Sequence, residues 1–298
     1  MNDFLWLAPR HTPACATMSG MELEFLESMG FYASAEQTYR LAADAEVRTV
    51  EQAGDFAWVS AYVDASGASI SFMQTLAGLT TESFAVYGAT PVQAHVWQVA
   101  PGLACAEVGS VNATHAGKGA TNAGQGASAR VRLLLSVDDP HLYPQYPLRA
   151  VGKPVRCNAF QLGAIASEVR AYDTVGQWAA DQTPVRKEDT YLKDVDDPSI
   201  PDELLIGPKF IASPLLAPLL EGHLAPADAG SSALFKGVVE SVEVVQNALT
   251  GRPWYKVAAD CGVPVMVAMP ATADPKPKVG GVIDGEVFMT GTSGTWLR

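Results

Sequence analysis

The sequence predicts an α+β protein, with an N-terminal mixed antiparallel sheet that carries helices and a small β-barrel at the C-terminal end. Three observations lead to this class. Apolar residues recur at helical spacing over 159–180, and they alternate at strand spacing in several segments between 56 and 137. Residues 233–292 hold β-rich runs separated by glycine turns. With 298 residues, the chain is long enough for two domains.

The division between the two predicted domains falls in a stretch of small and polar residues. The segment 225–232, Ala-Pro-Ala-Asp-Ala-Gly-Ser-Ser, is typical of a flexible interdomain linker. We therefore expect an α+β domain over residues 1–224 and a barrel over residues 233–298.

Helices are predicted where a capping signal or a period of 3.6 residues occurs. Ser34-Ala-Glu-Gln37 has the form of a capping box, which predicts a helix from Ser34 to about Ala45 with Tyr39 facing inward. A shorter helix is expected at 21–29, between two glycines. The longest is expected over 159–180 and packed across the N-terminal sheet. The apolar residues of its shared face are Leu162, Ile165, Val169, Tyr172, Val175, Trp178 and Ala179.

Strands are predicted where apolar residues alternate. Residues 56–63 and 70–76 flank the turn Asp64-Ala-Ser-Gly67, which predicts a β-hairpin. A second hairpin is expected over 92–108, with Pro101-Gly102 at its turn. A further strand is expected over 129–137.

A long loop of small polar residues, 109–126, connects the second hairpin to that strand. Its Gly117-Lys118-Gly119 is similar to part of a phosphate-binding loop. The motif requires a glycine at position 112 and Ser or Thr at position 119, where this chain has Asn and Gly. We interpret the segment as a hairpin loop.

The C-terminal segment begins with a long β-rich run, 233–246, whose alternation changes near Gly237. A bulge or bend there would explain the change. Strands are then predicted over 254–260 and 263–269, joined by Cys261-Gly262, and over 282–291 after a connection rich in Pro and Lys.

This order of strands resembles the OB-fold, in which a long, bent first strand precedes a hairpin, a connection and a strand that follows a glycine turn. The segment Lys278-Val-Gly-Gly-Val-Ile-Asp-Gly285 is similar to the entry into a late strand of such barrels. The resemblance covers about a fifth of the chain and concerns the fold alone. Only seven residues follow Gly291. A fifth strand is therefore short, absent or supplied by the N-terminal part.

Alternation assigns side chains to the two faces of the predicted barrel strands. Tyr255, Val257 and Ala259 point inward, as do alternate residues of 263–269 and 283–289. The outer face then carries the candidate binding residues Trp254, Lys256, Met266 and Phe288. Aromatic residues beside a cation suit base stacking, and Trp and Met also suit a protein interface. The same set suits packing against the chain's own first domain, which we rank first, with nucleic acid last.

The distribution of charge disfavours nucleic acid as a partner. The chain carries 20 basic and 32 acidic residues, a formal net charge of −12. Residues 231–298 hold six of each sign, so residues 1–230 hold 14 basic and 26 acidic residues. An acidic body repels a phosphate backbone.

No metal or cofactor motif is present in the sequence. The four cysteines, Cys15, Cys105, Cys157 and Cys261, lack CxxC spacing, and we expect reduced thiols. The five histidines are dispersed. His95, Asp138, Asp139 and His141 form the nearest approach to a polar cluster, and turn chemistry explains the Asp-Asp-Pro-His run equally well.

These observations favour a noncatalytic binding or assembly protein that presents a surface to other proteins, including a second copy of itself. Binding of single-stranded nucleic acid through the barrel is one alternative. An enzyme whose site is assembled from distant segments is the other. No apolar run approaches the length of about 20 residues needed to cross a bilayer, so no membrane partner is expected and a cytoplasmic location follows as the default.

Overall fold

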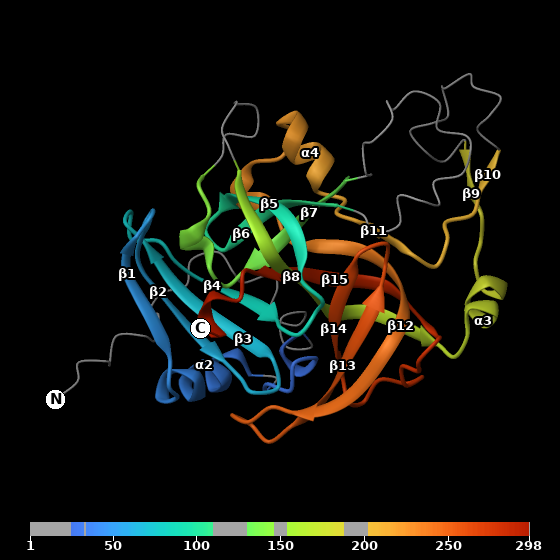
Figure 1. Cartoon of the computed structure of the whole chain (residues 1–298), viewed down its shortest axis with the longest axis horizontal. Helices are drawn as coiled ribbons and strands as arrows, with labels where there is room; N and C mark the ends of the chain where they lie inside the picture. The colour runs from blue at the N-terminus through green and yellow to red at the C-terminus, as the bar shows by residue number, and fades with distance from the viewer. Residues whose placement is uncertain (1–24, 33, 110–129, 146–153, 188–201, 298) are drawn as a thin grey trace.

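The computed structural model describes residues 25–32, 34–109, 130–145, 154–187 and 202–297 (Figure 1). These residues form mostly β-structure, and the α-helices whose bounds are defined within them are short. They are α2 (Ala35–Asp44), α3 (Val175–Ala180) and α4 (Leu216–Glu221). The predicted capping box is confirmed in part, because Ser34 Oγ accepts a hydrogen bond from the backbone N–H of Gln37 at 3.3 Å. Residues 25–27 are helical, and the rest of the helix expected at 21–29 lies partly outside the described residues.

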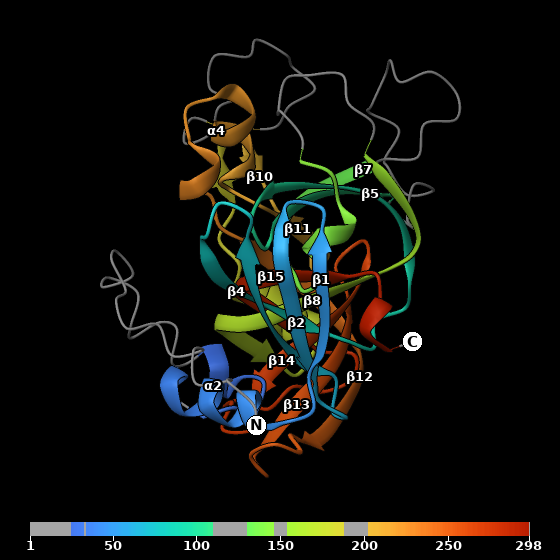
Figure 2. The ribbon, with the colours of Figure 1, turned by 90° about the vertical axis from the view of Figure 1, so that its left-hand side faces the viewer.

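A four-stranded antiparallel sheet occupies one side of the molecule (Figure 2). The predicted hairpin over 56–76 forms its two central strands. In spatial order the strands are β1 (Arg48–Ala53), β2 (Phe56–Val63), β3 (Ala68–Thr75) and β4 (Thr80–Val86).

A nine-stranded sheet forms the rest of the body, in the order β11-β12-β13-β14-β8-β15-β7-β6-β5. In chain order, its first four strands are β5 (Val92–Ala100), β6 (Leu103–Gly109), β7 (Arg130–Val137) and β8 (Val155–Tyr172). The others are β11 (Phe210–Ala212), β12 (Ser232–Gln246), β13 (Pro253–Asp260), β14 (Pro264–Pro270) and β15 (Val282–Thr292). A separate two-stranded ribbon pairs β9 (Val185–Arg186) with β10 (Glu203–Leu204).

Two extra pairings, β12 with β15 and β8 with β5, close this sheet into two rings of five strands. We call β12-β13-β14-β8-β15 the C-terminal ring and β5-β6-β7-β15-β8 the N-terminal ring. The same connection pattern occurs in both. A three-stranded meander is followed by a long strand, which pairs antiparallel with the first strand of its own meander and parallel with the third strand of the other. The long strands β8 and β15 pair with each other and belong to both rings.

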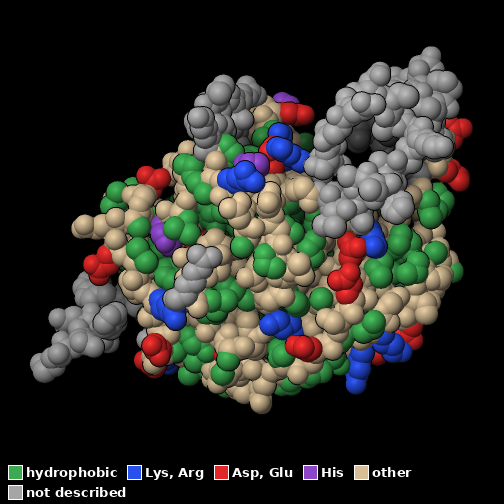
Figure 3. All heavy atoms as spheres, in the orientation of Figure 1, with side chains coloured by type: hydrophobic (Ala, Val, Ile, Leu, Met, Phe, Trp, Pro, Cys, Tyr) green, Lys and Arg blue, Asp and Glu red, His purple; other side chains and the backbone are tan. Residues whose placement is uncertain are grey.

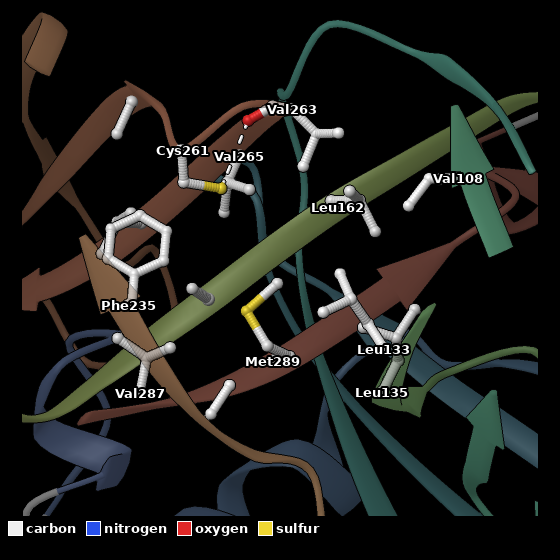
Figure 4. Close-up of a cluster of buried hydrophobic side chains, with 14 of the residues drawn as sticks. Val108, Leu133, Leu135, Leu162, Phe235, Cys261, Val263, Val265, Val287 and Met289 are labelled. Atoms are coloured by element: carbon white, nitrogen blue, oxygen red, sulfur yellow. Dashed lines mark hydrogen bonds between the residues drawn. The ribbon is translucent and has the colours of Figure 1, made fainter. Parts of the chain in front are cut away.

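One continuous apolar core fills both rings (Figure 4). The faces assigned by alternation are confirmed for the C-terminal strands, because Tyr255, Val257 and Ala259 lie in this core. So do Val263, Val265, Val267, Met269, Ile283, Val287 and Met289. Residues from the N-terminal ring, such as Leu133 and Leu162, complete it. The alternation is therefore a direct consequence of one face of each strand being turned inward.

The predicted α+β class is wrong, and the segment 159–180 accounts for most of the error. The expected helix is the long strand β8, and α3 follows only at Val175. Residues 160–166 are covered on both sides. Leu162 and Ala164 point into the ring core, whereas Ile165 packs against the four-stranded sheet and the N-terminal residues. A strand buried on both faces is continuously apolar, so it can match a helical pattern as well as a strand pattern.

The barrel predicted for residues 233–298 does not close with its own strands. The gap between β14 and β15 is closed by β8, which pairs parallel with β14 and antiparallel with β15. The segment 225–232, predicted as a linker, contains a 3-10 turn (Pro226–Asp228) and leads directly into β12. Strands from both sides of this segment share one sheet. The expected irregularity in the first strand is confirmed, with a register shift between Val239 and Ser241. The resemblance to the OB-fold stays a prediction.

The four-stranded sheet and the N-terminal residues cover the outside of the C-terminal ring. A second apolar cluster joins Phe25, Met29 and Ile70 to Trp254 and Met266 of the ring. Strand β4 also reaches the ring strands through side chains, since Thr290 Oγ1 accepts a hydrogen bond from the backbone N–H of Val86 at 3.2 Å. The outer face predicted for the barrel is therefore largely buried between the C-terminal ring and this cover.

Candidate functional site

The four candidate binding residues, Trp254, Lys256, Met266 and Phe288, do share the outer face of the C-terminal ring. That face is covered by the chain itself. Trp254 is completely buried and Met266 is 8% exposed. Trp254 Nε1 donates a hydrogen bond to Ser66 Oγ at 3.2 Å. The indole is therefore held inside the protein by both its apolar surface and its one donor.

Lys256 is also engaged internally. Its ammonium donates a hydrogen bond to the carbonyl oxygen of Ser66 at 3.0 Å. The side chain passes between two glycines, because a Cβ at Gly67 would lie 2.8 Å from Lys256 Nζ and one at Gly88 would lie 2.9 Å from Lys256 Cε. Burial lowers the pKa of this amine. A cation in this position supports the packing of the two parts and is poorly placed to meet a phosphate.

Phe288 differs from the other three because it lines an open cleft of about 250 Å³. The cleft lies where the N-terminal helical residues, strand β4, the β5–β6 turn and the segment before β12 meet. Besides Phe288, its apolar lining is Phe25, Leu26, Tyr39, Phe84, Pro101 and Leu103.

Aromatic side chains build the wall of this cleft. The ring of Phe25 stands edge-on to the rings of Phe84 and Phe288, with centroids 4.8 Å and 4.9 Å away. Gly102 adopts a φ of 75° in the β5–β6 turn, a conformation that favours glycine, and the turn brings Leu103 to the cleft. The geometry suits an apolar group inserted between rings.

Two polar groups lie at the edge of the cleft. Tyr39 OH donates a hydrogen bond to Glu82 Oε1 at 3.4 Å. Ser136 Oγ accepts one from the backbone N–H of Phe84 at 3.0 Å. Among the residues that line it, no nucleophile stands beside a general base. The cleft therefore provides a mainly apolar surface for binding, with its polar groups Tyr39, Glu82 and Ser136 at the edge.

The sequence could not identify this cleft, apart from Phe288. Phe25, Phe84 and Leu103 come from three separate segments. Each is an ordinary apolar residue of its own helix or strand. No spacing connects them. The only available signal was alternation, which placed Phe288 on the outer face.

The structure brings Asp138 and Asp139 into a buried polar cluster after strand β7. Asp138 Oδ2 accepts hydrogen bonds from Tyr87 OH at 2.5 Å and Ser69 Oγ at 3.2 Å. Asp139 accepts from Tyr143 OH at 2.8 Å. It also accepts from the backbone N–H and the hydroxyl of Ser293 at 2.9 Å and 2.6 Å. The two carboxyl groups thus connect the four-stranded sheet, the N-terminal ring and the C-terminal segment.

Burial governs the protonation of this cluster. Loss of solvent, followed by the charge of Asp139, raises the pKa of Asp138 to about 8. Burial also raises the pKa of Asp139 and lowers that of His141. Asp138 Oδ1 and His141 Nδ1 are buried without a hydrogen-bond partner among the described residues. The hydrogen bonds of the two carboxyl groups join three parts of the chain, so the cluster has the geometry of a structural clamp.

His95 does not join this cluster. It lies on the outer face of β5, opposite Glu107 of β6, and lines a different hollow. The described residues contain no group of three or more His, Cys, Asp or Glu side chains that could hold a metal ion. Cys105, Cys157 and Cys261 are free thiols, and burial raises the pKa of each. Thiols of this kind are poor nucleophiles.

Comparisons with known proteins give no information on this site. No family model matches the sequence, and neither a curated protein nor a solved structure shows significant similarity to it.

Proposed function

We propose that this chain is a noncatalytic binding protein and that its cleft receives an apolar side chain of a protein partner. The observation that carries the proposal is the open, aromatic-walled cleft beside Phe25, Phe84 and Phe288. Interface hot spots commonly consist of one aromatic or aliphatic anchor that enters a pocket of this kind.

The size of the cleft favours a side chain over a larger ligand. Its volume of about 250 Å³ lies below the range of roughly 300–1,000 Å³ that is usual for small-molecule sites. Single-stranded nucleic acid has less support. Trp254, the residue best suited to base stacking, is completely buried, and the formal charge of −12 opposes a polyanion.

Location forms part of the same proposal. None of the described helices is long and apolar enough to cross a membrane. We retain the cytoplasm as the expected compartment, which the free thiols at Cys105, Cys157 and Cys261 support.

The test is a fluorescence titration with N-phenyl-1-naphthylamine, an uncharged apolar probe. Ser231 lines the cleft from the segment before β12, so Ser231→Trp fills the cleft without removing core packing, and Ser231→Ala is the matched control. We expect saturable binding to the wild type and the Ala variant, displacement by N-acetylphenylalaninamide but not by N-acetylglycinamide, and loss of binding in the Trp variant. Equal binding by the Trp variant, or none by the wild type, would contradict the proposal.

A further inference from the structure

A second feature lies on the outer face of the N-terminal ring, away from the apolar cleft. Cross-strand register places Arg156 (β8), His95 (β5), Glu107 (β6) and Arg132 (β7) in one row across four neighbouring strands. Residues directly opposite one another on adjacent strands have their side chains on the same face. Figure 3 shows basic side chains and a histidine gathered beside α4 in this region.

A hollow lies two residues further along β6 and β7, beside the row that contains Glu107 and Arg132. Gly109 of β6 is opposite Arg130 of β7, and a Cβ built at Gly109 would have no atom within 4 Å. Gly109 lines a pocket of about 310 Å³ together with Gln93, His95, Glu107 and Arg130. The glycine leaves this part of the pocket open between neighbours that carry long polar side chains.

The charges around this pocket are more positive than those of the chain as a whole. Three arginines, Arg130, Arg132 and Arg156, lie on this face with one carboxylate, that of Glu107, and of these Arg130 and Glu107 line the pocket itself. Glu107 binds Arg132 Nε at 2.5 Å, whereas its contact with Arg130 is 3.7 Å, too long for a hydrogen bond. Arg156 donates a hydrogen bond to the Gln93 amide oxygen at 3.3 Å. Arg130 is thus ion-paired with Glu107 without a hydrogen bond, and 60% of its side chain is exposed, so its N–H donors can reach an incoming acceptor.

We propose that this pocket binds the phosphate or carboxylate group of a small molecule. A guanidinium presents a planar fork of donors that matches these two groups. Gln93 and His95 add further polar groups from the facing strand. A small ligand is favoured over an extended polyanion because the positive region is local and the remainder of the chain is acidic. The proposal does not depend on the apolar cleft.

The test is calorimetric titration with pyrophosphate and, separately, with citrate, at constant ionic strength. Gly109→Val narrows the pocket with a branched side chain, which a strand position accepts readily. Gly207→Val is its matched control, since a Cβ there also meets nothing within 4 Å. We expect saturable binding to the wild type and the Gly207 variant, and none to the Gly109 variant. The anion that binds more tightly identifies the group recognised.

Arg130→Gln keeps the test decisive if the valine variant fails to fold. It retains the length of a polar side chain and removes the charge. We expect its affinity for the same anion to fall about tenfold or more, since hydrogen bonds to charged groups are the strong ones. Absence of saturable binding to the wild type, or unchanged affinity in both pocket variants, overturns the proposal.

Discussion

The two rings have the same strand order, but their outward side chains differ. On β13 and β14 the C-terminal ring presents Trp254, Ala258, Met266 and Ala268, and these contact the N-terminal cluster that covers them. On β5, β6 and β7 the N-terminal ring presents an apolar row, Trp97, Cys105 and Leu134, under Leu219 of α4. Two residues further along the same strands, the row becomes His95, Glu107 and Arg132 and remains open.

This difference shows that topology does not decide which surface is free for function. The inward positions of both rings are mostly apolar and build one core. The outward positions decide whether a strand is covered by another element or meets solvent. The C-terminal ring is the internal support of the molecule, and the N-terminal ring carries the open charged face. The following variants test that contrast, beginning with the largest expected effect.

Trp254→Ala should cause the greatest loss of stability. The indole is completely buried between the C-terminal ring and its cover, so truncation removes a large apolar contact and leaves a cavity. We expect the free energy of unfolding to fall by about 3–5 kcal/mol in urea denaturation. Trp58→Ala is the control, because Trp58 is only partly buried on β2. Equal losses in the two variants would show that the ring and its cover are not closely coupled.

The contact between the N-terminal ring and the four-stranded sheet should depend on pH through Asp138. Its pKa is raised to about 8 in the folded protein, against 3.8 for an unperturbed group, so the folded state holds a proton that the unfolded state has lost. Its contribution is complete below about pH 4 and is lost as the pH rises to about 8. The free energy of unfolding should therefore decrease by at most about 1.4 kcal/mol per pH unit from this group.

Asp138→Asn isolates this contribution from that of His141. The lowered pKa of His141 acts with the opposite sign, because a buried neutral imidazole is favoured as the pH rises. Unfolding midpoints should be measured from pH 5 to pH 8 for both proteins. We expect stability to decrease more steeply with pH in the wild type than in the Asn variant. Parallel pH profiles would rule out Asp138 as the titrating group.

Local signals predicted every strand of the two rings except β8, whose surroundings depend on contacts with distant segments. Alternation identified 129–137 and the C-terminal strands, because alternate apolar residues of each strand belong to the ring core. In β8, Leu162 contacts the core and Ile165 contacts the cover, which removes the alternation. No local pattern records that a second sheet lies above a strand, so this element was predicted as a helix.

The same limit applies to the candidate site. Alternation correctly placed Trp254 and Phe288 on the outer face, but their exposure depends on residues far earlier in the chain, such as Ser66 and Phe25. The cleft and the arginine pocket are likewise assembled from several strands. Gly109 was visible in the sequence only as the start of a long loop, 109–126, of which the remainder lies outside the described residues.

Leu219→Ala tests the cover of the N-terminal ring. Leu219 is completely buried on α4, a helix of six residues, and packs against Trp97 and Leu134. We expect a loss of about 2 kcal/mol, at the low end for a buried leucine because a short surface helix can adjust to the cavity. Leu76→Ala, at a side chain that is 67% exposed, is the control. A loss as large as that of Trp254→Ala would show that the covers of the two rings contribute equally to stability.

The smallest effects should come from ion pairs on the two rings, measured by urea denaturation. On the C-terminal ring, Lys278 Nζ lies 2.7 Å from Asp173 Oδ2, with side chains 58% and 47% exposed. Solvent screens such a pair, so Lys278→Ala should cost less than about 0.5 kcal/mol. On the N-terminal ring, Arg132→Ala leaves Glu107, only 14% exposed, without its closest cation and should cost about 1 kcal/mol. A reversed order would contradict the view that the open face of the N-terminal ring holds its charges in a structured arrangement.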